Sequence, residues 1–241
     1  MAWQINQRLA VAVAVGLGLA VAIAQSASAQ GGGGGRGFGR MFGVSKARLA
    51  TLEEVQTELK LSDEQKDQIE DINEQLREDR RGLFGGGFGQ FSEIRTKMDE
   101  LNSKASAEVD GKLDEDQRKR LQEIAIQVNG PSALNDPSVV DQLGLSDEQK
   151  KKLEAVRSEN SQARDEAMDN SGELSREEQR EKFRGLADTA NEKLLGVLTD
   201  EQKTKFEEMK GKAIEIDPSS LFGGGGGGGG FGGGGGGGEN R

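Results

Sequence analysis

Apolar residues recur at steps of three and four along several stretches of this chain, with charged residues between them. The longest stretches are 62–81 and 90–110 in the first half and 147–168 and 175–194 in the second. This spacing places apolar side chains along one side of an α-helix. The pattern therefore predicts four long amphipathic helices, each about 30 Å long at 1.5 Å per residue.

A five-residue motif occurs at four predicted helix starts. Each copy has a leucine, then Ser, Thr or Asp, then two acidic residues and a glutamine. The second residue can accept a hydrogen bond from a free backbone N–H, and the glutamine can reach back, which is a capping box. The motif residues are Leu61, Ser62, Gln65, Leu113, Asp114, Gln117, Leu145, Ser146, Gln149, Leu198, Thr199 and Gln202.

The spacing of the four motifs indicates a duplication. From Leu61 to Leu113 is 52 positions and from Leu145 to Leu198 is 53, whereas the first-to-third step is 84 and the second-to-fourth is 85. Apolar positions upstream of the motifs follow the same offsets. A repeat of this length that occurs only twice predicts a duplicated supersecondary unit.

Shorter elements complete each predicted unit. In the first, Ser45 caps a short helix with apolar residues through Leu59, glycines at 82–89 form the turn between the long helices, and Asn129-Gly130-Pro131 ends the helix that begins at Asp114.

In the second unit, Asp136-Pro137 starts a short helix and residues 169–172 form the turn. Ser175 and Glu178 form a fifth capping box. A last helix is expected from Asp200 to about Ala213, and Asp217-Pro218 is expected to end the folded part.

The expected fold is all-α, with two tandem antiparallel hairpins of long helices, short flanking helices and disordered glycine-rich segments on either side. The expected domains are a signal peptide at 1–29, a glycine-rich linker at 30–44, helical units at 45–130 and 131–217, and a glycine-rich tail at 218–241.

The first thirty residues predict export. Arg8 precedes a 16-residue apolar run, and Ala27-Ser28-Ala29 is a small-residue cleavage site. An uncleaved membrane anchor is the alternative, although the run is shorter than the roughly 20 apolar residues of a spanning helix. The expected location is periplasmic or extracellular, with no stable membrane insertion after cleavage. The glycine-rich linker and tail are interpreted as flexible spacers, and a self-associating tail is the alternative.

Composition excludes several kinds of chemistry. The 241 residues include no cysteine and no histidine, which removes disulfides, Cys/His zinc sites and catalytic triads. Residues 44–217 carry 28 basic and 41 acidic residues, so nucleic acid is not an expected partner. No metal, cofactor or catalytic residue is predicted, because the carboxylates alternate with Lys and Arg as on ordinary exposed helices.

The leucine-Ser/Thr-x-x-glutamine pattern before each helix, as in Leu61 to Gln65 and Leu198 to Gln202, resembles the LTxxQ-motif family of bacterial periplasmic proteins, the Spy- and CpxP-like proteins. The resemblance implies bent helical hairpins, which pair as a dimer in that family, and ATP-independent chaperone or envelope-stress roles. Four motifs in one chain predict a tandem duplication that closes on itself as a monomeric pseudo-dimer rather than a homodimer.

Two functions follow as hypotheses. The first is a chaperone-like module that binds unfolded or envelope proteins through partly exposed apolar stripes. The second is a structural or regulatory protein that binds one partner and uses its tail as a tether. Five residues in the stripes either bind clients or pack within or between the hairpins: Ile69, Ile72, Leu76, Met98 and Phe183. Leu83, Phe84 and Phe88 in the first glycine-rich turn are candidate client contacts.

Overall fold

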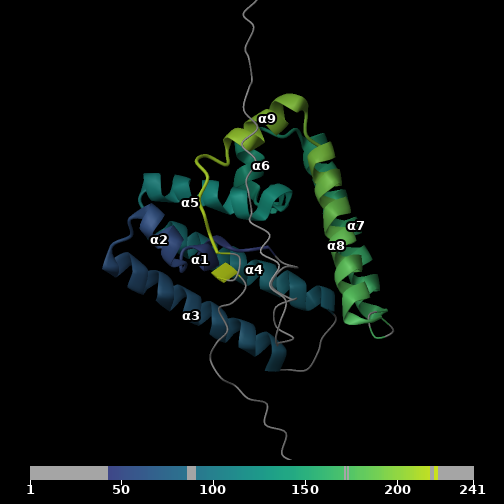
Figure 1. Ribbon diagram of the computed structural model, residues 1–241, viewed down its shortest axis with the longest axis horizontal. Coiled ribbons are helices and arrows are strands. Elements are labelled where there is room, and N and C mark those ends of the chain that lie inside the picture. The colour runs from purple at the N-terminus through teal and green to yellow at the C-terminus, as the bar shows by residue number, and fades with distance from the viewer. Residues whose placement is uncertain (1–42, 86–90, 171, 173, 218–219, 222–241) are drawn as a thin grey trace, which may run out of the picture. The chain divides into compact units, whose positions relative to one another are not determined.

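The computed structural model describes residues 43–85, 91–170, 172, 174–217 and 220–221, and the regular structure in these ranges is helical (Figure 1). The predicted all-α fold is therefore confirmed. The signal peptide, the linker up to Phe42 and the glycine-rich tail lie outside the described residues. All described residues belong to one unit, residues 33–241.

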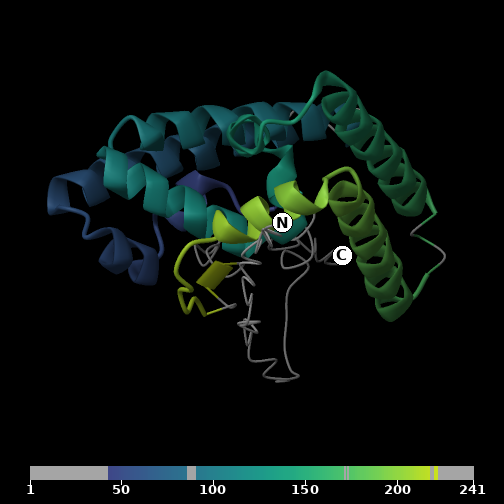
Figure 2. The same cartoon turned by 90° about the horizontal axis from the view of Figure 1, so that it is seen from above.

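The first half contains α1 (Lys46–Leu49), α2 (Glu53–Leu59), α3 (Asp63–Gly85), α4 (Phe91–Asp110) and α5 (Glu115–Asn129). The second half contains the 3₁₀-helix η2 (Gly130–Asn135), then α6 (Pro137–Leu143), α7 (Asp147–Asp169), α8 (Arg176–Gly196) and α9 (Asp200–Glu208). Helix α3 packs against α4, and α7 packs against α8. Figures 1 and 2 both show α7 and α8 side by side.

Contacts between the paired helices join the start of one helix to the end of the other, as an antiparallel hairpin requires: Gln68 and Lys112 line one cavity, and Gln149 donates to the Val197 carbonyl. Arg80, late in α3, donates a hydrogen bond to Asn102 in the middle of α4. In the second pair, Lys193 near the end of α8 forms an ion pair with Glu159 in the middle of α7. The two hairpins predicted from the glycine-rich and Asn-Ser-Gly turns are thus present.

The two halves correspond element by element. Helices α2 and α6 each have seven residues, α3 and α7 each have 23, and both pairs are separated by 84 positions. The correspondence extends to side chains: Asn73 donates to the Ala47 carbonyl in α1, and Arg157, 84 positions later, donates to the Leu134 carbonyl in η2. Helix η2, which the sequence did not predict, therefore takes the place of α1.

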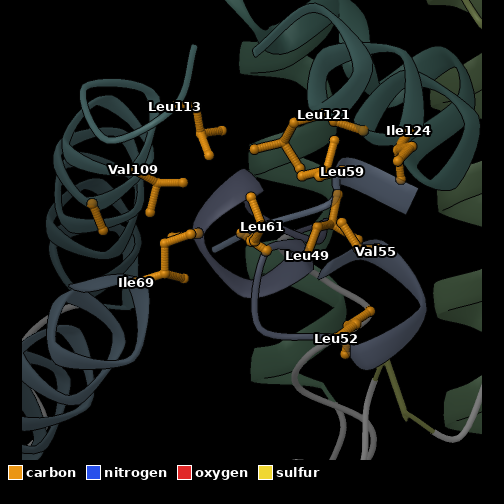
Figure 3. Close-up of a cluster of buried hydrophobic side chains, with 14 of the residues drawn as sticks. Leu49, Leu52, Val55, Leu59, Leu61, Ile69, Val109, Leu113, Leu121 and Ile124 are labelled. Atoms are coloured by element: carbon orange, nitrogen blue, oxygen red, sulfur yellow. The ribbon is translucent and has the colours of Figure 1, made fainter. Parts of the chain in front are cut away.

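The buried side chains form two clusters. The first lies among α1 to α5, and Figure 3 shows Leu61 among side chains from the short helices, α3 and α4. The second lies among η2 and α6 to α9, and it includes Ile126 from α5. Residues Ile214, Ile216 and Leu221, which follow α9, pack against the first cluster. Each half therefore contributes side chains to the core of the other.

Four predicted element boundaries were wrong. The helix expected from Ser45 through Leu59 is broken between α1 and α2, where the Thr51 hydroxyl donates to the Arg48 carbonyl and Leu52 is extended. This break lets Leu49 and Leu52 both be buried. Helix α3 continues through Gly82 to Gly85, because a single helical glycine costs only about 1 kcal/mol.

The other two wrong boundaries lie near the C-terminal end. Helix α9 ends at Glu208 instead of Ala213, since Gly211 adopts a φ of 60° and turns the chain back toward α5. The fold also extends past Asp217, because Leu221 packs against the first cluster.

Helices α2 and α6 end in the same left-handed conformation, at Lys60 (φ 52°) and Gly144 (φ 66°). Only glycine adopts this conformation without steric cost. Lys60→Gly is therefore expected to raise the free energy of unfolding by about 0.5–1 kcal/mol, and Gly144→Ala to lower it by about 1 kcal/mol. Urea denaturation followed by circular dichroism measures both changes, and a loss of stability in Lys60→Gly would contradict the argument.

Candidate functional site

The four motif glutamines cap their own helices as predicted. In each motif the glutamine Oε1 accepts a hydrogen bond from the backbone N–H of the capping residue at 3.0 Å. The side chain of that residue in turn accepts from the glutamine N–H at 2.8 to 3.3 Å. The fifth box, at Ser175 and Glu178, has the same geometry.

The motif glutamines also pair with each other across the base of each hairpin, which the sequence did not predict. Gln65 Nε2 donates to Gln117 Oε1 at 2.8 Å, and Gln117 Nε2 donates back to Gln65 Oε1 at 3.2 Å. Gln149 and Gln202 form the same reciprocal pair at 2.6 and 3.2 Å. The spacings of 52 and 53 positions thus bring two capping boxes together in each half.

Main-chain contacts extend these glutamine pairs. Gln65 Nε2 also donates to the Lys112 carbonyl, and Gln117 Nε2 donates to the Leu59 carbonyl. Gln149 Nε2 donates to the Val197 carbonyl in the second half. The motif leucines beside them are buried, each between 4 and 7% exposed. The motif is therefore a structural clamp at the base of each hairpin: its leucines are buried and its glutamine side chains are hydrogen-bonded, whereas its four capping residues are exposed.

Among the described residues, a second surface of interest is the seam between α3 and α4, which is open to solvent. Two cavities, of about 660 and 450 Å³, lie along it. Their lining residues come from about four turns of α3, from α4 and from the two residues after α4: Gln68, Asp71, Ile72, Gln75, Glu78, Asp79, Gly82, Leu83, Lys97, Glu100, Leu101, Lys104, Glu108, Gly111 and Lys112. We call this surface the α3–α4 seam. It combines three apolar side chains with five carboxylates and three lysines.

The candidate stripe residues divide into two groups. Ile69 and Leu76 are buried, so they pack within the first half and are not client contacts. Ile72, Met98 and Phe183 are half-buried. Ile72 and Leu101 lie at the edge of the first cluster, with part of each side chain in the seam. Sequence periodicity does not separate these two groups, because all of them lie on the apolar side of their helices.

The predicted tip contacts have different outcomes. Leu83 is half-buried and lines the larger cavity, so it belongs to the seam. Phe84 lies in the last turn of α3, and its side chain is outside the described part of the structure. Phe88 lies in the turn outside the described residues. A client contact by these three residues stays a prediction.

A polar contact joins the two hairpins. Arg95 of α4 donates to the Ser161 hydroxyl and forms an ion pair with Asp165, both in α7. Burial raises the pKa of Asp99, one turn after Arg95, and the Arg95 charge opposes that increase. Burial lowers the pKa of Arg164 beside this contact and of Arg80, its counterpart in α3. Both guanidinium groups nevertheless stay charged at neutral pH.

Among the described residues, no group of three or more carboxylates is placed to hold a metal ion. Within the same ranges, none of the helices combines the length and apolar character needed to cross a membrane. Comparisons of the chain with protein families, with curated proteins and with solved structures found no match.

Proposed function

We propose that this protein is an exported, ATP-independent protein-binding module that holds unfolded client chains along the α3–α4 seam. The supporting observation is the exposure of Ile72, Leu83 and Leu101 in two adjoining cavities between charged side chains. An unfolded chain presents apolar side chains together with charged and polar groups. The seam offers a partner for each of these groups over a length of about 20 Å.

The proposed binding is weak and reversible. The seam exposes few apolar side chains, and its charges are exposed to solvent, where ion pairs typically contribute less than about 1 kcal/mol each. Such a surface binds and releases a chain without a conformational change that needs nucleotide hydrolysis. Its five carboxylates against three lysines favour client segments that carry positive charge.

The purified chain is expected to suppress the aggregation of two unrelated unfolding proteins at near-stoichiometric amounts, with no nucleotide added. The double variant Ile72→Ser/Leu101→Ser is expected to lose more than half of this suppression, because it removes apolar surface from both cavities. Light scattering during client unfolding measures the effect. Circular dichroism of each variant checks that it is folded.

The duplication supplies a matched control. Val156 and Leu186 occupy the corresponding positions in α7 and α8 and are also half-buried. Val156→Ser/Leu186→Ser removes similar apolar surface outside the seam and is expected to keep the suppression. Equal losses in both double variants would contradict the assignment to the seam. No suppression by the unaltered chain would instead favour a protein that binds one specific partner.

A further inference from the structure

The segment that follows α9 returns to the first half of the chain. Figure 1 shows it as an extended trace that leaves α9 and passes α5. Along it, Ile214 and Ile216 are half-buried against the first cluster, whereas Glu215 and Asp217 between and after them are exposed. We call residues 210–217, with Ser220 and Leu221, the strap. Its alternating burial is that of an extended chain lying on an apolar surface.

Five hydrogen bonds connect the first half to main-chain atoms of the strap. The Gln127 side chain donates to the Lys210 and Lys212 carbonyls and accepts from the Ile214 N–H at 3.2 Å. Arg120 donates to the Lys212 carbonyl at 2.8 Å, and Arg48 donates to the Ser220 carbonyl at 2.7 Å. We call Arg48, Arg120 and Gln127, with the apolar cluster beside them, the platform.

The start of the strap is fixed by Gly211. Its φ of 60° suits glycine, and a Cβ at this position would lie 2.1 Å from Glu123 Oε2. Glu123 accepts from Arg120, so the glycine lies against the same group of side chains that binds the strap. Two of the platform side chains also have partners within the first half: Arg120 forms ion pairs with Glu58 and Glu123, and Arg48 donates to the Thr51 hydroxyl.

This arrangement has the features of extended-peptide recognition. Hydrogen bonds to main-chain atoms are available from any sequence except at proline, and apolar side chains at alternate positions supply the selectivity. We propose that the platform is a binding site for an extended segment of another protein with branched aliphatic residues two positions apart. The strap occupies this site in the same chain and is exchanged for such a segment. The residues that bind the strap main chain, Arg48, Arg120 and Gln127, all lie outside the seam, so the proposal does not depend on the function proposed above.

A fluorescein-labelled peptide with the sequence of residues 210–221 tests the proposal by fluorescence anisotropy with the full chain. A tethered strap competes at an effective concentration in the millimolar range, so binding to the unaltered chain is expected to be weak. The strap variant Ile214→Ser/Ile216→Ser is expected to bind the peptide at least tenfold more tightly. Glu215→Ser, at the exposed position between them, is the matched control and is expected to bind as the unaltered chain does.

Adding Gln127→Ala to the strap variant is expected to abolish the gain, because three of the main-chain hydrogen bonds are lost. A peptide with serine at both isoleucine positions is expected not to bind. If the strap variant binds the labelled peptide no more tightly than the unaltered chain, the platform is not an exchangeable site.

A second measurement uses the unaltered chain, so it does not depend on whether the strap variant folds. Hydrogen exchange of residues 210–221 is expected to become faster when the unlabelled peptide is present in excess, because the Ile214 N–H loses its bond to Gln127. Unchanged exchange at saturating peptide would overturn the proposal. Suppression of client aggregation is a separate readout, which Ile72→Ser/Leu101→Ser alters and Gln127→Ala leaves unchanged.

Discussion

Phe206→Ala is expected to lower the free energy of unfolding by about 4 kcal/mol, the largest effect of any single change considered for this chain. Phe206 is 1% exposed and belongs to the second cluster. Removing its ring leaves a cavity among side chains of η2 and α6 to α8, which cannot close without moving the long helices. Leu121, 85 positions earlier and fully buried, is its counterpart, and Leu121→Ala is expected to cost about 3 kcal/mol.

Both variants are expected to shift one common unfolding transition. Ile126 of α5 packs in the second cluster, and Ile214 and Ile216 from beyond α9 pack in the first, so neither half keeps its core when the other unfolds. Urea denaturation followed by circular dichroism gives the midpoint. Hydrogen exchange of α3 and α7 at intermediate urea shows whether the halves unfold together.

The exposed neighbour Glu208 provides the control for this prediction, because Glu208→Ala alters the same helix without opening a cavity. Its free energy of unfolding is expected to stay within about 0.5 kcal/mol of that of the unaltered chain. Protection of α3 that persists in Phe206→Ala after α7 has exchanged would show that the halves unfold independently.

Local signals in the sequence were sufficient to predict the helices and the residues at which they begin. Capping boxes depend on residues three positions apart, and helix periodicity depends on neighbours within two turns, so both can be recognised without the tertiary structure. The 84-position offset also predicted the correspondence between the halves, which extends to Asn73 and Arg157. These signals placed the bases of both hairpins correctly.

Contacts between distant residues could not be predicted in this way. The strap reaches the platform because Gly211 turns the chain and Gln127 binds it 83 or more positions away. Likewise, Ile69 and Ile72 have the same periodic signal, and it is the tertiary packing, including that of α1 against α3, that buries the first and leaves the second in the seam. The apolar stripes could therefore be predicted from the sequence, whereas the part of them that is exposed in the seam could be identified only from the structure.

The glutamine pairs leave a signal in the sequence: the last position of each paired capping box is Gln, and the preference for Glu or Gln in capping boxes does not by itself explain this choice. A capping box accepts either Glu or Gln, yet the four paired boxes have Gln and the unpaired fifth box has Glu178. Only an amide can cap its helix through Oε1 and also donate to a second amide. The choice of glutamine at Gln65, Gln117, Gln149 and Gln202 is thus explained by the pairing.

Gln65→Glu tests this explanation because it keeps the cap and removes the donor. Its carboxylate still accepts from the Ser62 N–H, but it faces the Lys112 carbonyl and Gln117 Oε1, to which Gln65 donates. Two lost hydrogen bonds and the contact between acceptors are expected to lower the free energy of unfolding by about 2 kcal/mol in urea denaturation at pH 7. Gln149→Glu is expected to have a similar effect in the second half.

The fifth box separates pairing from capping. Glu178 accepts hydrogen bonds from Ser175, which lower the pKa of its carboxyl group, and the reverse change Glu178→Gln keeps an acceptor for that cap. It is expected to shift the unfolding midpoint far less than Gln65→Glu.

A double-mutant cycle with Gln65→Ala and Gln117→Ala tests the pairing directly. The coupling energy between the two glutamines is expected to be about 1 kcal/mol, since either change alone already breaks the pair. Additive losses would mean that each glutamine acts only as a cap, and the clamp at the hairpin base would have to be abandoned.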